Sequence, residues 1–156
     1  MQNRHTTGAK SLHPSHTRAA RDPSLGRMHT RAQIGRRGER LAAGKLEADG
    51  YRVIERNYRT REGELDIVAV RDGTIVFCEV KTLVARTGEG GGPLFALESV
   101  HAGKRTQVRR MARSWIAERP RSVAVRGRPA VRFDAIGVVL SVAGELLRID
   151  HVEAAF

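Results

Sequence analysis

Apolar residues recur along the chain with two periods, one typical of helices and one typical of strands. Residues 31–46 carry them at helical spacing, and Gly50 follows as a stop signal, so this segment predicts an amphipathic helix. Residues 99–118 show the same spacing and predict a second helix. The apolar face of that helix is expected to consist of Val108, Met111, Ala112 and Trp115.

Shorter apolar or alternating runs predict strands. They cover residues 51–58, 63–71, 74–82, 131–140 and 145–152. The predicted order is therefore helix, three strands, helix and two strands, within one domain over residues 31–156.

Residues 1–30 lack this patterning and contain almost no bulky apolar side chain, so we expect a disordered basic N-terminal extension. Four histidines lie here at spacings that match no usual metal-ligand pattern, which favours a solvated tail: His5, His13, His16 and His29. A chain that starts at Met28, a candidate translation start, has a net charge of +7 instead of +11. We expect that deletion to leave thermal stability unchanged and to weaken non-specific binding to polyanions at low salt.

Charged residues interrupt the second and third predicted strands, where buried side chains are expected. The dipeptide at 72–73, Asp-Gly, is a strong signal for a two-residue hairpin turn between these strands. That turn places Asp66 opposite Glu79 and Glu64 opposite Lys81, all on one face of the hairpin. The opposite face is expected to belong to the core, through Leu65, Ile67, Cys78 and Val80.

Two carboxylates that face each other on a sheet repel, and a divalent cation between them removes that repulsion. Mg²⁺ takes oxygen ligands of this kind, together with water and phosphate oxygens. With Lys81 beside Asp66 and Glu79, the group has the chemistry of metal-assisted phosphodiester hydrolysis. The alternative is a solvated sheet face on which Glu64 and Lys81 form an ordinary cross-strand ion pair.

The charge of the chain favours a polyanionic partner. The formal net charge is +11, and 24 of the 28 basic residues are arginine, which suits phosphate recognition. The segment 104–132 has ten basic residues and one acidic residue, and Arg105, Arg109 and Arg113 recur at helical spacing within it. We expect this stripe to contact the DNA phosphate backbone. The aromatic content of 4% argues against base-stacking recognition of single strands.

A single cysteine, Cys78, excludes an internal disulfide and fits a reducing cytoplasm. No apolar run reaches the length of a membrane span, so we expect no membrane association.

The order of these motifs resembles the PD-(D/E)XK nucleases and, more closely, the YraN family of bacterial proteins. The matching stretches are GRRGERLAAGKLEADGYRVIERNYR, GELDIVAV, VFCEVKT, VRFDAIGV and HVEAAF, which span about residues 35–156. The resemblance implies an α/β restriction-endonuclease-like fold, a mixed central sheet flanked by helices, similar to archaeal Holliday junction resolvases.

The same resemblance implies roles for individual residues. Asp66, Glu79 and Glu39 would be ligands of Mg²⁺ or Mn²⁺, and Lys81 would act on the attacking water or the scissile phosphate. Glu64 is an auxiliary candidate. Lys104 matches a lysine common in the family and joins the expected DNA contacts.

Three functions remain open at this level. The first is a metal-dependent DNA endonuclease that acts on branched or damaged duplex. The second is a nucleic-acid-binding module that keeps the nuclease fold without catalysis, and the third is an adaptor for a protein partner. The sequence also leaves open whether the protein forms a homodimer.

Overall fold

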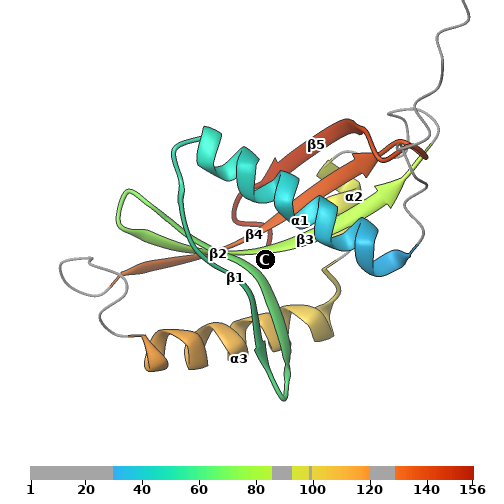
Figure 1. Cartoon of the computed structure of the whole chain (residues 1–156). Helices are drawn as coiled ribbons and strands as arrows, with labels where there is room; N and C mark the ends of the chain where they lie inside the picture. Colours follow the sequence, from blue (N-terminus) through green and yellow to red (C-terminus); the bar gives the residue numbers. More distant parts are fainter. Residues whose placement is uncertain (1–29, 86–92, 99, 120–128) are drawn as a thin grey trace, which may run out of the picture.

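The computed structural model describes residues 30–85, 93–98, 100–119 and 129–156. The predicted N-terminal extension lies outside the described residues except for Thr30, which caps the first helix. The described chain forms one mixed sheet with helices on both of its faces, which confirms the predicted α/β class (Figure 1).

The predicted order of elements is confirmed with one addition, a short helix α2 before the second long helix. The elements are α1 (Arg31–Ala48), β1 (Arg52–Thr60), β2 (Gly63–Arg71), β3 (Thr74–Val84), α2 (Pro93–Glu98), α3 (Ala102–Glu118), β4 (Ala130–Leu140) and β5 (Leu146–Val152). Helix α3 begins at Ala102, because the Nδ1 atom of His101 caps it by accepting a hydrogen bond from the amide of Lys104.

The sheet has the strand order β1-β2-β3-β4-β5. Strands β3 and β4 run parallel, and every other neighbouring pair is antiparallel. A parallel pair requires a long crossover connection, and here the connection contains α2 and α3. This crossover brings α3 to the face of the sheet opposite α1 (Figure 1).

Helix α1 packs very closely on β3. A capping box between Thr30 and Gln33 starts the helix. At Gly38, an added Cβ atom would lie 1.9 Å from Oγ1 of Thr82, so only glycine permits this approach. Glu39 follows directly in sequence and is thereby held next to the β3 segment that carries the predicted motif.

Helix α3 covers the other face with the apolar residues that its pattern predicted, and Val108, Met111, Ala112 and Trp115 are all buried. The two helices therefore enclose separate apolar clusters. Ile67, Cys78 and Val80 pack in the cluster under α1, as expected. Leu65 instead packs in the cluster under α3, which corrects its predicted placement with Ile67.

The tip of the β1–β2 hairpin is fastened to α3. Gln107 donates a hydrogen bond to the carbonyl oxygen of Glu62, and Nε of Arg110 lies 2.6 Å from Oε2 of Glu62. An added Cβ atom at Gly63 would also meet the Gln107 amide at 2.4 Å. These contacts fix the first turns of α3 beside β2. In the described part of the chain, no helix combines the length and apolar character needed to cross a membrane.

Candidate active site

The predicted β2–β3 hairpin forms with the expected turn. Asp72 and Gly73 have φ angles of 49° and 75°, as a two-residue turn of the primed type requires. The ladder runs from Arg71 opposite Thr74 to Ile67 opposite Cys78 and goes no further. The two strands therefore separate just before the charged residues.

Asp66 occupies the point of separation. Its Oδ2 atom accepts a hydrogen bond of 2.7 Å from the amide of Val80, in place of a main-chain carbonyl. The prediction that Asp66 and Glu79 form a directly opposed ladder pair is therefore corrected, because the pair is not part of the register. The two carboxylates still interact, since the charge of Glu79 acts on Asp66.

The environment of Asp66 disfavours its charged form. The residue is only 7% exposed. Burial, followed by the neighbouring charge of Glu79, raises the pKa of Asp66 to about 7, against a weaker opposing effect of the Val80 amide. The charge of Glu39 contributes to this increase, so the α1 carboxylate belongs to the same electrostatic group.

Glu79 shares this environment but has a cation beside it. Burial raises the pKa of Glu79, while Lys104 opposes that increase through its charge and its hydrogen bond. Nζ of Lys104 lies 3.0 Å from Oε1 of Glu79, and both side chains are largely buried. Lys104, predicted to contact DNA, is thus engaged with a site carboxylate.

Lys81, unlike Lys104, is not paired with a carboxylate of the site. It is exposed, and among the described residues it has no hydrogen-bond or ion-pair partner. It lines a groove of about 440 Å³ together with Glu39 and residues of α1 and β3. The amine of Lys81 is therefore available to a ligand in that groove.

Glu64, the auxiliary candidate of β2, has an ion-pair partner outside the carboxylate pair. Its Oε2 atom pairs with Nε of Arg59 at 3.1 Å, so the alternative Glu64–Lys81 ion pair does not form. Its charge also raises the pKa of Glu79. A second groove of about 440 Å³ is lined by Glu64, Lys104 and Gln107, among others. Asp66 and Glu79 are thus flanked by two groove-lining lysines.

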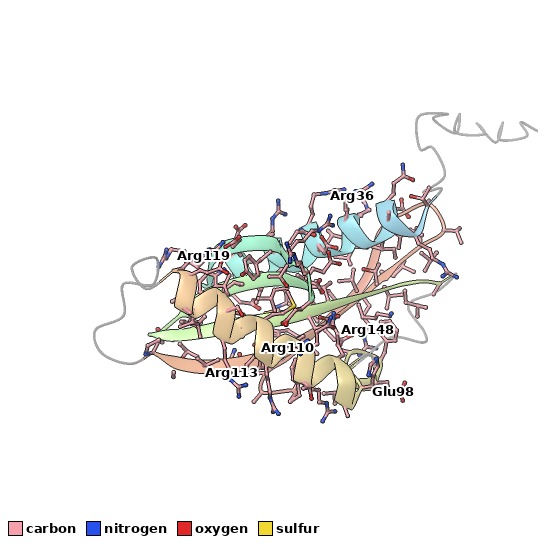
Figure 2. All side chains as sticks on the ribbon, turned by 90° about the horizontal axis from the view of Figure 1, so that it is seen from below. Arg36, Glu98, Arg110, Arg113, Arg119 and Arg148 are labelled. Carbon is pink, nitrogen blue, oxygen red and sulfur yellow. The ribbon has the colours of Figure 1, made fainter. Side chains whose placement is uncertain are left out.

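The predicted arginine stripe on α3 is less uniform than its spacing suggested. Arg105 is half-buried, and its Nε atom donates a 2.7 Å hydrogen bond to the carbonyl oxygen of Val100. Arg109 is exposed and lies over the ring of Phe133, with 5.8 Å between its guanidinium carbon and the ring centroid. Arg113 is exposed on the same helix (Figure 2). Only the last two present a mainly exposed side chain.

The carboxylates fit a hard divalent cation by their chemistry. Asp66 and Glu79 are buried oxygen donors, each with a like charge that disfavours its ionisation (Glu79 for Asp66, Glu64 for Glu79), and the ammonium group of Lys104 pairs with Glu79. A bound cation would reduce the repulsion between these negative charges, and Mg²⁺ and Mn²⁺ prefer oxygen ligands of this type. Glu39 is close enough to influence Asp66 electrostatically and is the third candidate ligand.

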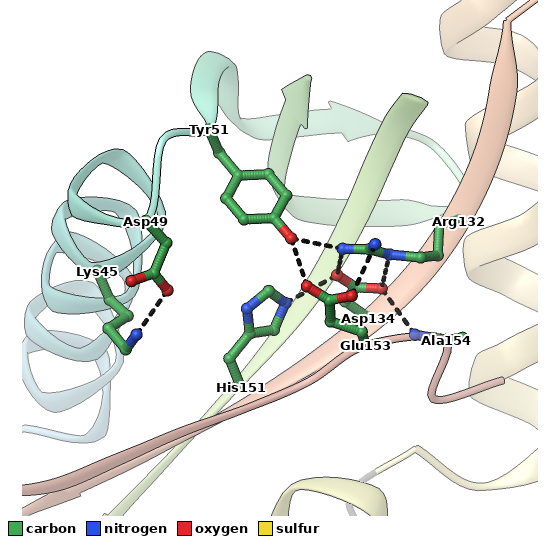
Figure 3. Close-up of polar contacts among 8 residues, drawn as sticks. All are labelled: Lys45, Asp49, Tyr51, Arg132, Asp134, His151, Glu153 and Ala154. Atoms are coloured by element: carbon green, nitrogen blue, oxygen red, sulfur yellow. Dashed lines mark hydrogen bonds and ion pairs between the residues drawn. The ribbon is translucent and has the colours of Figure 1, made fainter. Parts of the chain in front are cut away.

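A second buried carboxylate, Asp134 of β4, belongs to a different network (Figure 3). Arg132 donates two hydrogen bonds of 2.8 Å to Asp134, and His151 lies 2.7 Å from it. The amide of Ala154 donates another, at 3.0 Å. Tyr51 joins the network through Arg132. Burial alone would raise the pKa of Asp134, but these hydrogen bonds outweigh it and lower the pKa.

Sequence reasoning gave this network no role, although HVEAAF was among the matching stretches. The ligand atoms of Cys78, Asp134 and His151 lie within 4.8 Å of one another. A metal site is nevertheless disfavoured, because Arg132 and His151 already occupy the Asp134 oxygens and Arg132 adds a fixed positive charge. The network joins the C-terminal segment to the sheet, since His151 lies in β5 and Ala154 follows that strand.

Comparison with known proteins identifies a family of similar sequences. Residues 38–138 match the uncharacterised protein family UPF0102. A UPF0102 protein of Parafrankia sp. (strain EAN1pec) is 40% identical over 131 residues, which cover 83% of this chain and 100% of the relative. A relative from Frankia casuarinae is 42% identical over 130 residues, with the same coverage of both chains. One from Geobacter metallireducens is 41% identical over 124 residues, covering 79% of this chain and 91% of the relative. On the strength of these matches, the chain belongs to the uncharacterised protein family UPF0102, the YraN family.

Proposed function

We propose that the protein is a metal-dependent DNA endonuclease. The observation that carries this proposal is that two neighbouring carboxylates, Asp66 and Glu79, are both buried in surroundings that raise their pKa values. Both carboxylates are largely buried, the charge of Glu79 disfavours ionisation of Asp66, and neither has the full set of donors that Asp134 has. A protein that needed these residues only for stability would gain by replacing them with apolar side chains.

The residues around this pair supply the remaining requirements of phosphodiester hydrolysis. A divalent cation, when bound, makes a water molecule more acidic and polarises the phosphate. Asp66 and Glu79 would hold that cation, with Glu39 as a further ligand. The exposed amine of Lys81 would donate to a phosphate oxygen in the groove beside Glu39 and stabilise developing negative charge.

The basic character of the chain supports DNA as the substrate class. Its net charge is +11, and Arg109 and Arg113 are exposed on α3, the helix that also carries Lys104. Contacts of this kind recognise the phosphate backbone rather than base edges, so shape is the property of DNA that the protein would distinguish. Branched or damaged duplex is the finer proposal.

The test is a cleavage assay on linear duplex, nicked, flap and four-way-junction DNA with Mg²⁺ or Mn²⁺. We expect cleavage by the wild-type protein and its loss, by about 100-fold or more, in D66N, E79Q and K81A. D72N is the matched control, because it makes the same substitution at an exposed turn position of the same hairpin.

Two other results would identify the competing functions. Salt-dependent DNA binding without cleavage by the wild-type protein on any substrate would favour the non-catalytic binding module. Absence of both binding and cleavage would favour the adaptor. Equal cleavage by wild-type protein and D66N would place the chemistry at another site.

A further inference from the structure

The ion pair between Lys104 and Glu79 joins two elements that are distant in sequence. Lys104 lies in the first turn of α3, and Glu79 lies on β3 beyond the end of the β2–β3 ladder. Their charged atoms are 3.0 Å apart, and their side chains are 21% and 14% exposed. Among the described residues, no other cation forms an ion pair with Glu79 or Asp66.

The position of Lys104 in its helix is unfavourable on local grounds. The N-terminus of a helix carries a partial positive charge, which favours acidic side chains and disfavours lysine. Helix α3 has no acidic residue in its first turn. The amide of Lys104 is also the group that His101 caps. The attraction of the Lys104 ammonium to Glu79 and Asp66 offsets its unfavourable interaction with the helix dipole.

A single ammonium acts on both carboxylates. Burial raises the pKa of Glu79, and Lys104 opposes that increase through its charge and a hydrogen bond. The charge of Lys104 also opposes the increase in the pKa of Asp66. The motif lysine, Lys81, acts on Glu79 more weakly and makes no ion pair with a described residue. The two lysines therefore differ in their surroundings. Lys104 is paired with Glu79, whereas the amine of Lys81 can contact a ligand in its groove.

We propose that Lys104 is a removable counter-ion of the carboxylate pair, which holds Glu79 in the metal-free protein and releases it when a divalent cation binds. This inference rests on the proposed function. The single negative charge of the Glu79 carboxylate would have to serve the ammonium and the metal at once, and two cations so close together repel each other. Binding of the metal and retention of the Lys104–Glu79 pair are therefore competing events.

The structure also offers a place for the released ammonium. Lys104 lines the groove that Arg59, Glu64 and Gln107 also line, and this groove shares no lining residue with the groove of Lys81. Lysine is flexible, so its amine can turn from Glu79 toward this groove without movement of α3. A phosphate of the substrate strand is the ligand chemistry that the amine would meet there.

The experiment is a calorimetric titration of the full chain with Mn²⁺, without DNA, at pH 8.5. We expect K104Q to bind Mn²⁺ at least about fivefold more tightly than the wild-type protein, because the competing cation is gone. K104M, which keeps the aliphatic stem, should show the same gain and serves as a second uncharged variant. K104R keeps the positive charge and should retain near wild-type affinity.

K45Q is the matched control, since Lys45 also forms an ion pair, with Asp49 at the far end of α1. Its Mn²⁺ affinity should equal that of the wild-type protein. Asp66-dependent Mn²⁺ binding that is unchanged or weaker in folded K104Q and K104M would overturn the counter-ion proposal and leave the proposed function standing. A wild-type protein without saturable Mn²⁺ binding, or one in which D66N binds equally well, would overturn both.

Discussion

The pKa values of two buried aspartates of the same sheet, Asp66 and Asp134, are shifted in opposite directions. Asp66 is 7% exposed and Asp134 is fully buried. Asp134 receives hydrogen bonds from Arg132, His151 and a backbone amide, and its pKa falls below the ordinary value. Asp66 receives one such bond and is subject to the charge of Glu79, and its pKa rises to about 7. Burial is common to both, so the difference lies in their partners.

This contrast predicts opposite effects of pH on two equivalent substitutions. The folded-state pKa of Asp66 is raised, so the stability that its proton provides is present below the ordinary pKa near 3.8 and is lost as the pH rises through 7. We therefore expect D66N to be more stable than the wild-type protein at pH 8, by about 1–4 kcal/mol, and nearly equal to it at pH 4. The asparagine can still accept the Val80 amide.

For Asp134 the sign is reversed, because its folded-state pKa is lowered. Its contribution is present above the ordinary pKa and is lost as the pH falls through the folded-state value. D134N should lose about 3–5 kcal/mol at pH 8, and the loss should shrink in acid. Thermal or urea unfolding at several pH values measures both variants, and a loss of stability for D66N at pH 8 would make its carboxylate structural.

At the same scale, the sequence identified most of the candidate site and missed its counter-ion. The spacing of Asp66 and Glu79 across an Asp-Gly turn placed them on one face, which the electrostatic coupling between them supports. The exact pairing was wrong, because the Asp66 side chain takes the place of a main-chain acceptor and the ladder ends there. The contact of Lys104 with Glu79 depends on how α3 docks, which no local pattern contains.

At the scale of elements, the packing of α1 on β3 controls the distance between Glu39 and Lys81. The contact is set at Gly38, whose place against Thr82 leaves no room for a Cβ atom. Gly44 lies in the same helix with nothing within 4 Å of an added Cβ atom. The two glycines therefore separate the effect of crowding from the effect of helix propensity.

We expect G38A to lose about 1–3 kcal/mol of stability, because α1 must move away from β3 or Thr82 must shift. The same movement displaces Glu39 and should reduce metal-dependent cleavage. G44A should instead gain about 0.5–1 kcal/mol, since alanine favours the helix and the site is exposed. Urea unfolding and cleavage rates of both variants test this. Equal stability of the two variants would mean that α1 and β3 adjust without cost.

The elements themselves were largely predictable because their patterns are local. Gly50 ended the first helix, and the apolar face of α3 was identified residue by residue. Helix α2 was missed because six residues are too few to show a helical period. Leu65 was assigned to the wrong face, since strict alternation fails where β2 separates from β3.

At the scale of the whole molecule, exposed arginines lie on both long helices, which cover opposite faces of the sheet. Helix α3 carries Lys104 at the candidate site and continues with Arg109 and Arg113. Both of these arginines have exposed side chains. Helix α1, on the opposite face of the sheet, exposes Arg36 (Figure 2). Arg40 of the same helix is also exposed. Net charge alone would make these two pairs of arginines equivalent for DNA binding.

We expect them to differ, because under the proposed function DNA at Asp66 and Glu79 would lie beside α3, where Arg109 and Arg113 are exposed. Replacing Arg109 and Arg113 by alanine should make the dependence of log K on log salt shallower by about 0.9 for each lost phosphate contact. R36A/R40A removes the same charge and should leave that slope unchanged. Binding of a short duplex, measured by fluorescence anisotropy across a salt series without divalent cation, gives both slopes. A shallower slope in R36A/R40A alone would instead bring the DNA to the α1 side of the sheet, and equal changes in both variants would reduce the effect to net charge.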